Sequence, residues 1–456
     1  MEIRLDSHKG AGYIKNMELI AYHDVESPNL FQMALHRTQS GKYYLYGATF
    51  GGLGIHIFDV TDPANPRFIK RVYPYDPKEY PKTSTIKIQV CENLLMLSVT
   101  CGGGAWFSKR KLDGSDEYEA GLLIYSIAED PENPELLSFW NCGVPNSTGV
   151  HRFMYNGGRY VHLSAEQKGF YGLVYRIIDV EDPRNPKDVS TFFLPEQYYF
   201  GSLDPELTSY NPSAPHFPGF MDKIHLHGPP YVRDGLAYCG YNGAGLCIVD
   251  VHDVTAPRLV GRLGMHPPFA SGYAGARCHT ALPLTGRDLV VVTNEGERWG
   301  VMFDEKLGED GAQAYNSICM IDVKNPAKPV LISIFPYPEV PEEFPYKNFN
   351  YCGLKNPGAF GPHNLHEPMS NKPYLEDNPN RVYNCYFHAG MRVYDVSDPY
   401  YIKELAYFIP PPPNYRRFQA WPGPLLGTAE DCVVDDRGYI YMGTLEDGLF
   451  ILKCLV

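Results

Sequence analysis

The chain of 456 residues has no stretch approaching 18 consecutive apolar residues, so it predicts no membrane-spanning helix. It also has no run of lysine and arginine, and its net charge is −13, which argues against nucleic acid or an anionic membrane as a partner. Its eleven cysteines occur without a Cys-x-x-Cys pair, as expected of reduced thiols. Because Met1–Asp6 lacks an apolar signal core, we expect a cytoplasmic protein.

Three common catalytic signatures are missing as well. There is no Gly-x-x-x-x-Gly-Lys-Ser/Thr phosphate loop, no Gly-x-Ser-x-Gly nucleophile motif and no His-Glu-x-x-His zinc motif. The pair His366–Glu367 continues as Pro-Met-Ser and does not complete the last of these. Any catalytic group must therefore come from residues that are distant in the sequence.

What the chain does contain is a repeat in which an apolar strand ends in an acidic turn, in most copies with a pair of prolines. Six copies and a degenerate seventh recur about every 50 to 75 residues, which predicts repeat units that bury their apolar faces together. The copies are Ile57–Pro66, Ile124–Pro134, Ile177–Pro186, Ile248–Pro257, Met320–Pro329, Val393–Pro399 and Gly448–Lys453.

Each repeat belongs to a unit of four predicted strands with no helical period between them. In the third unit the β-forming runs are Val150–Tyr155, Arg159–Ser164, Leu173–Val180 and Val189–Leu194. Four antiparallel strands per unit are typical of one blade of a β-propeller. The Asp-Pro-x-x-Pro element suits the tight turn, because proline fixes φ and cannot continue the ladder.

The two ends of the chain complement each other. The last unit supplies only three strands, and Met17–Tyr22 resembles the missing fourth. We therefore predict a single all-β domain over 1–456, a seven-bladed propeller closed by an N-terminal strand in the C-terminal blade. The expected blades are 28–75, 84–141, 149–195, 223–264, 277–335, 361–408, and 428–454 with 16–24.

The strand Gly-Leu-x-Ile-x-Asp-Val within Gly245–Pro257 resembles the LVIVD-repeat family of seven-bladed propellers. This resemblance covers nearly the whole chain and implies the architecture, while propellers of one shape host unrelated chemistries.

Long insertions rich in tyrosine, phenylalanine and proline join the outer strand of one blade to the inner strand of the next. They lie at 198–220, 335–360 and 408–421. Such connections share one face of a propeller, and long loops of this kind are commonly functional. We expect them to form a lid over that face.

Histidines recur at the start of the predicted inner strands. Four of them, with Glu430 in the last blade, occupy matching repeat positions, whereas the first two blades have Ala34 and Thr85 there. Equivalent positions on inner strands converge on the central axis, and imidazoles with a carboxylate are typical ligands of first-row transition metals. The predicted metal ligands are His151, His227, His279 and His363, with His366 as an alternative to His363.

Other candidates surround this predicted site. Glu295 and Glu367 are expected behind it, accepting the second ring N–H of a ligand histidine. Four more residues are candidates for catalysis: Glu430 and His225 as general base or proton shuttle, and Arg152 and Arg277 as groups that hold an anionic substituent.

These residues favour a metal-dependent enzyme acting on a small aromatic or apolar molecule. The first hypothesis is an Fe(II) oxygenase with a dioxygenase-like reaction; the carotenoid-cleaving oxygenases are a parallel in architecture, with four blade-derived histidines and outer glutamates. The alternative is a lyase, hydratase or hydrolase that uses Zn(II) or Mn(II) as a Lewis acid. A non-enzymatic propeller that binds proteins is the third hypothesis, and assembly as a homo-oligomer stays open.

Overall fold

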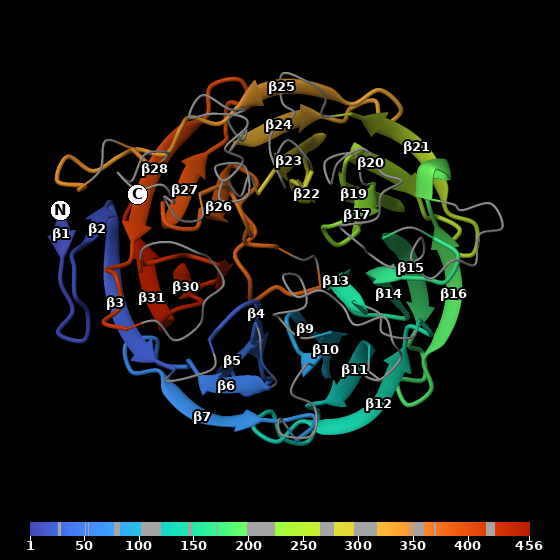
Figure 1. Ribbon diagram of the computed structural model, residues 1–456, viewed down its shortest axis with the longest axis horizontal. Helices are drawn as coiled ribbons and strands as arrows, with labels where there is room; N and C mark the ends of the chain where they lie inside the picture. Colours follow the sequence, from blue (N-terminus) through green and yellow to red (C-terminus); the bar gives the residue numbers. More distant parts are fainter. Residues whose placement is uncertain are drawn as a thin grey trace, which may run out of the picture.

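The computed structural model describes residues 1–25, 29–50, 52, 54–76, 83–101, 120–144, 148–170, 172–197, 224–264, 278–295, 317–345, 348–349, 360–368, 371–415 and 425–456. Their strands form seven antiparallel sheets arranged as a ring around a central axis (Figure 1). The predicted seven-bladed, all-β fold is confirmed. Within the described ranges the helical element is the short 3₁₀ turn Pro195–Gln197, and no helix there is long and apolar enough to cross a bilayer.

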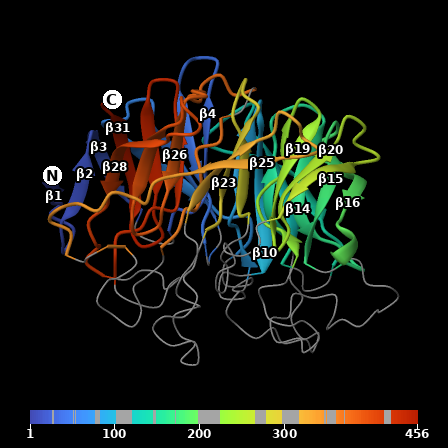
Figure 2. The ribbon, with the colours of Figure 1, turned by 90° about the horizontal axis from the view of Figure 1, so that it is seen from above.

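The blades follow one another around the ring in chain order. Figure 2, turned by 90° from Figure 1, shows their strands standing next to one another. Blade 1 contains β4 (Met33–Arg37), β5 (Tyr43–Gly47), β6 (Ile55–Asp59) and β7 (Arg67–Val72). Blade 2 contains β8 (Thr83–Ser84), β9 (Ile88–Cys91), β10 (Leu94–Cys101), β11 (Gly121–Ser126) and β12 (Glu135–Asn141). Blade 3 contains β13 (Val150–Met154), β14 (Tyr160–Glu166), β15 (Leu173–Asp179) and β16 (Lys187–Phe192).

The remaining blades complete the circle. Blade 4 contains β17 (His225–Leu226), β18 (Tyr231–Arg233), β19 (Leu236–Asn242), β20 (Gly245–Asp250) and β21 (Arg258–Leu263). Blade 5 contains β22 (Thr280–Pro283), β23 (Leu289–Thr293), β24 (Ile318–Asp322) and β25 (Val330–Ile334). Blade 6 contains β26 (Arg381–Cys385), β27 (Met391–Asp395), β28 (Lys403–Ile409), β2 (Gly12–Lys15) and β1 (Glu2–Ile3), and blade 7 contains β29 (Asp431–Val434), β30 (Tyr439–Gly443), β31 (Gly448–Cys454) and β3 (Met17–Asp24).

The N-terminal segment takes part in two neighbouring blades. Strand β3 pairs with β31 from Met17 opposite Cys454 to Asp24 opposite Gly448, which confirms the predicted closure of the ring. Strand β2 pairs with β28 and carries β1 on its other side, an extension of blade 6 that the sequence did not predict. The first 24 residues therefore join blades 6 and 7 along their outer strands.

Blade 6 differs from the others at the axis. Its inner position is held by an irregular segment that pairs with β26 through the single bridge Leu365–Asn384. His363 N–H donates to the Cys385 carbonyl at 2.8 Å, and Cys385 N–H donates to the Asn364 carbonyl at 2.9 Å. These bonds replace a regular ladder and fix the backbone around His363.

The acidic turn of the repeat is stabilised by aspartate side chains. In blade 1, Asp59 accepts the Thr61 N–H at 3.0 Å and Asp62 accepts the Ala64 N–H at 3.1 Å. Asp179 and Asp182 make the same bonds in blade 3, at 2.9 and 3.1 Å. Aspartate is favoured here because its short side chain can bond the backbone two residues ahead.

The repeat strand also carries a register shift against the outer strand in every blade. In blade 4 the shift lies between Ile248 and Val249. A β-bulge bends the strand and increases its twist, so each blade turns between its axial and outer edges. Glycine opens this strand because Gly245 has φ of +83°, and a Cβ there would lie 2.1 Å from the Leu263 carbonyl oxygen.

Candidate metal centre

Four histidines gather where the inner strands of blades 3 to 6 begin. His151 lies in β13, His227 follows β17, His279 precedes β22, and His363 lies in the irregular segment of blade 6. Successive ring centroids are 4.4, 4.1 and 5.0 Å apart. The repeat register thus brings these four side chains together, as the sequence predicts.

Burial sets the protonation of these rings. It holds the pKa of all four histidines well below the ordinary value, and the positive charge of Lys87 lowers the pKa of His151 and His363 further. The rings are therefore neutral at pH 7, and each has one nitrogen lone pair available for a metal.

The hydrogen bonds of His363 and His279 place their Nδ1 atoms away from the cluster. His363 Nδ1 donates to the Glu430 carbonyl at 2.9 Å, so its lone pair is on Nε2. His279 Nδ1 lies 2.8 Å from Thr280 Oγ1. Bonds at the second ring nitrogen fix the tautomer and orientation of a metal-binding histidine.

The Nε2 atoms of His151 and His227 face each other at 3.2 Å. Two lone pairs at this distance repel unless a proton or a cation lies between them. When two ligand nitrogens each lie about 2.1 Å from one metal ion and the nitrogen–metal–nitrogen angle is about 90° to 110°, the two nitrogens are about 3.0 to 3.4 Å apart. The separation fits two ligands of one ion.

Glu295 completes the cluster from the loop after β23. Its carboxylate lies 3.8 Å from His227 Nε2, 3.8 Å from His279 Nε2 and 3.9 Å from His363 Nε2. Ligand atoms of His227, His279 and Glu295 lie within 4.8 Å of one another, an arrangement that could hold a metal ion.

The backbone of Glu295 is unusual, because its φ of +62° places a non-glycine residue in the left-handed region. Its N–H donates to the Pro362 carbonyl at 3.0 Å, next to His363. Strained backbone of this kind costs of order 1 kcal/mol and is found at functional sites. The turn brings the carboxylate toward the Nε2 atoms, so Glu295 lies with the predicted ligands and not behind them, where the sequence analysis expected it.

Glu430, in contrast, lies behind the histidines and not among them. Its fully buried carboxylate lies 3.3 Å from His363 Nδ1, on the ring edge that faces away from the cluster. The expected general base therefore has the position of a group that polarises a ligand histidine. The structure exchanges the roles that the sequence predicted for Glu295 and Glu430.

Arg152 and Glu367 pair with each other. Arg152 Nη2 lies 2.8 Å from Glu367 Oε1, and Arg152 Nη1 donates to Thr280 Oγ1 at 2.7 Å. Tyr231 also donates its hydroxyl to Glu367. The prediction that Arg152 holds a substrate anion, and that Glu367 accepts a histidine N–H, does not match these contacts. Arg152 instead positions Thr280, which contacts His279, and Glu367 holds Arg152 in place.

The other candidates lie apart from the cluster. His366 Nε2 donates to the Glu376 carbonyl at 2.7 Å and its Nδ1 accepts the Val434 N–H at 3.2 Å, so His363 and not His366 joins the other histidines. His225 Nε2 is 3.1 Å from Asn242 Nδ2, and the His225 ring lies 6.2 Å from that of His227. Arg277 is outside the described residues.

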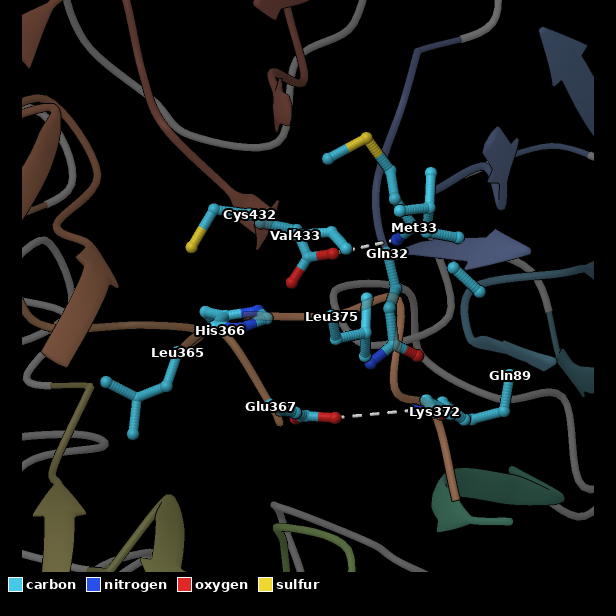
Figure 3. Close-up of a pocket in the computed structure, with 13 residues that line it drawn as sticks. Gln32, Met33, Gln89, Leu365, His366, Glu367, Lys372, Leu375, Cys432 and Val433 are labelled. Atoms are coloured by element: carbon cyan, nitrogen blue, oxygen red, sulfur yellow. Dashed lines mark hydrogen bonds between the residues drawn. The ribbon is translucent and has the colours of Figure 1, made fainter. Parts of the chain in front are cut away.

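A second group of polar side chains lines a cavity of about 30 Å³ that has room for one or two water molecules (Figure 3). Asp431 accepts the Met33 N–H at 2.7 Å there, and burial raises the pKa of its carboxyl to about 7. Lys372 donates to Gln89 at 3.0 Å, and Gln89 donates to Glu367 at 3.3 Å. Polar contacts thus continue from this cavity through Glu367 toward the histidines.

The aromatic insertions are the part of the prediction that the structure describes least. The segment 198–220 is outside the described residues, as are most of 350–360 and 416–421. Phe349 and Phe360 are described, buried and stacked on each other with centroids 5.8 Å apart. The expected lid stays a prediction.

Two residues near the histidines were not identified from the sequence. The Phe31 ring lies 5.9 Å from the His363 ring, and Lys87 Nζ lies 4.2 Å from the centre of the Phe31 ring. Lys87 follows by two positions Thr85, the residue that marks blade 2 in the repeat register. Because it lies two positions beyond the repeat position that carries histidine in other blades, the repeat register does not mark it.

Comparisons with known proteins agree on the architecture. The profile of the LVIVD repeat matches residues 231–264, which span β18 to β21 of blade 4. The resemblance seen in the sequence is thereby confirmed: the chain carries an LVIVD repeat in a seven-bladed propeller. No curated protein matches the sequence.

Among solved structures, the periplasmic gluconolactonase of Pseudomonas aeruginosa is similar at 10% identity and a TM-score of 0.51, over 90% of this chain and 95% of that one. A streptogramin B lyase has 9% identity and a TM-score of 0.48, over 96% and 97%. Sqt1 of Saccharomyces cerevisiae has 9% identity and a TM-score of 0.49, over 95% and 97%. At such identities the likeness concerns the propeller fold alone.

Proposed function

We propose that the chain is a metal-dependent enzyme of the lyase or hydrolase type, acting on a small molecule at the histidine cluster. The observation that carries this proposal is the convergence of three Nε2 atoms on the Glu295 carboxylate at 3.8 to 3.9 Å, with His151 Nε2 3.2 Å from His227 Nε2.

The donor set fits a first-row divalent ion. His151, His227, His279 and His363 offer neutral imidazole nitrogens, which suit Zn, Mn and Fe ions. Glu295 would supply a carboxylate oxygen or stand beside the ion. Glu430 and Thr280 lie behind two of the ligands, the arrangement that keeps a ligand histidine in place.

A bound Zn(II) or Mn(II) would polarise a carbonyl or acidify a water molecule. The protein's own contribution is the carboxylate of Glu295, held by its left-handed backbone within reach of the same centre. In this position it can accept a proton from a water molecule or from the carbon next to a polarised carbonyl. Arg152, which Glu367 holds in place, positions Thr280 and so orients His279.

The iron(II) oxygenase remains a second proposal, since four imidazoles bind iron as well as zinc. Its basis is the donor set. The position of Glu295 favours acid–base chemistry, because a carboxylate among the ligand nitrogens can move a proton.

Metal analysis of protein purified without a histidine tag tests both proposals. We expect about one equivalent of metal per chain in the wild type and none in the double variant H227A/H279A. Zinc or manganese would support the lyase or hydrolase, which is then assayed on small lactones and β-hydroxy acids. Iron would support the oxygenase.

The matched control is H366Q, which changes a buried histidine of blade 6 whose nitrogens bond to backbone. It should retain its metal. If wild-type protein binds no metal even after reconstitution, both enzyme proposals fail and a protein-binding propeller becomes the better account.

A further inference from the structure

The histidine cluster covers only part of the ring. Its histidines come from blades 3 to 6, and Glu430 stands behind them in blade 7, whereas the described residues of blades 1 and 2 contribute neither a histidine nor a carboxylate to it. The side facing those two blades is where a substrate can approach without displacing a ligand.

Aromatic and aliphatic side chains occupy that side. Phe31 lies 5.9 Å from the ring of His363 and 5.0 Å from that of Phe50. Phe31, Ile86 and Leu445 form a small apolar cluster with Phe50, distinct from the cores between the blades. An apolar surface beside polar ligands is typical of a small-molecule site.

Lys87 adds a positive charge to this surface. The residue is 2% exposed, and its ammonium lies 4.2 Å from the centre of the Phe31 ring. Among the described residues no carboxylate lies within ion-pair distance of Lys87 Nζ. A buried charge without a close counter-ion is costly, and burial, followed by the charge of Arg152, lowers the pKa of Lys87 to about 7.

Three acidic groups near Lys87 have other partners, and one of them, Glu430, lies 3.3 Å from His363 Nδ1. Glu367 pairs with Arg152 at 2.8 Å, and Asp431 accepts the Met33 N–H at 2.7 Å. They act on Lys87 only at longer range. An anionic group on a bound molecule would supply the close partner that Lys87 lacks.

We propose that Lys87 and Phe31 form the substrate side of the site, and that the substrate is a small aromatic molecule carrying a carboxylate. The anion would pair with the Lys87 ammonium while the ring packs on Phe31. The part of this inference that concerns reaction rests on the proposed function, whereas the anion site itself does not. It gives Lys87 the role that the sequence analysis assigned to Arg152.

Ligand-observed NMR tests the proposal with two probes of equal shape, benzoate and its neutral counterpart benzamide. Wild-type protein should bind benzoate at least about tenfold more tightly than benzamide, as one charge-assisted hydrogen bond provides. In K87M, which keeps the length of the side chain without the charge, the preference should disappear. K372M is the matched control: it removes another buried lysine, whose partner is Gln89, and should keep the preference.

Repeating the titrations on metal-free protein separates the two proposals. A preference that survives metal removal and vanishes in K87M supports the anion site, even if the metal proposal fails. A preference that vanishes on metal removal and survives in K87M overturns the anion site, because the carboxylate then binds the metal. Absence of benzoate binding in both wild-type forms also overturns it.

Replacing an unpaired buried ammonium by an apolar side chain of similar length is expected to preserve the fold, which circular dichroism checks. Should K87M fail to fold, K87Q retains polarity without charge and is judged by the same ratio of affinities. An undiminished ratio in K87Q would refute the proposal.

Discussion

The carboxylate of Glu430 offers a sharp test of how the cluster is organised. Its Oε2 atom lies 3.3 Å from His363 Nδ1, while its own backbone carbonyl accepts the Nδ1–H at 2.9 Å. Substituting E430Q removes the charge and leaves the backbone bond, so the tautomer of His363 should not change. The expected effect is therefore electrostatic: a weaker donor at His363 Nε2.

Removal of a group behind a metal ligand typically lowers metal affinity by 10- to 100-fold. We expect E430Q to lie near the lower end, about tenfold, because the shorter of the two bonds survives. Fold stability should not decrease, since a fully buried carboxylate is replaced by a neutral amide. Competition for zinc with a chromophoric chelator measures the affinity, and thermal melting of the metal-free protein checks the fold.

The matched control is E376Q, because Glu376 is a partly buried carboxylate that accepts a hydrogen bond from Tyr383 and makes no contact with the cluster. It should leave zinc affinity unchanged. An affinity for E430Q within twofold of the wild type would refute the reasoning, since His363 would then need no carboxylate behind it. A loss above a thousandfold would also refute it, by making Glu430 a direct ligand.

Two further predictions concern stability. G245A should destabilise the fold by about 2 kcal/mol or more in chemical denaturation, because a Cβ would lie 2.1 Å from the Leu263 carbonyl oxygen. The control G41A, at a glycine of similar φ with open space around it, should cost about 1 kcal/mol. Equal losses in the two variants would contradict the steric argument. In metal-free protein, the free energy of unfolding should fall below pH 6.5 by roughly 1.4 kcal/mol per pH unit for each buried histidine of lowered pKa. Such a group is neutral in the fold and protonates first in the unfolded chain, so stability is complete above pH 6.5 and declines toward the folded pKa; equal unfolding free energies at pH 7.5 and 5.0 would exclude this. Outside the cluster, the described histidines whose pKa is lowered to about 4 include His36, His162 and His366.

The blade architecture could be predicted because the same local interactions recur in each repeat. Asp59 and Asp179 make the same turn bond in different blades. In four blades the glycine at the start of the repeat strand meets the same steric demand, because a Cβ there would lie 1.9 to 2.2 Å from a backbone carbonyl oxygen; these are Gly121, Gly245, Gly390 and Gly448. Blade 6 was less predictable, since its inner segment forms one bridge instead of a ladder. The pairing of β2 with β28 had no repeat to indicate it.

The site was predictable to the level of backbone position. Repeat register placed His151, His227 and His279 correctly together, because equivalent strand positions share a place around the axis. It could not give the direction of a side chain beyond the strand. Glu295 turns inward through a left-handed residue, and Glu430 lies behind His363, so their roles were exchanged.

The pairing of charged side chains could not be predicted from the sequence either. Arg152 is adjacent to His151 in the sequence, yet its guanidinium reaches Thr280 and Glu367. The pairing of the Arg152 guanidinium with Glu367 depends on packing between residues 215 positions apart in the sequence. Lys87 is left without a close anion for the same reason, a fact that only the three-dimensional arrangement supplies.

The N-terminal segment that joins blades 6 and 7 has a consequence for how the chain matures. Strand β3 is synthesised before the strands of blades 1 to 5 and its partner β31 after them, so this pair forms only once those strands have been made. Contacts of such large sequence separation form late and slowly. The four histidines of blades 3 to 6 can therefore come together in an arc that is still open.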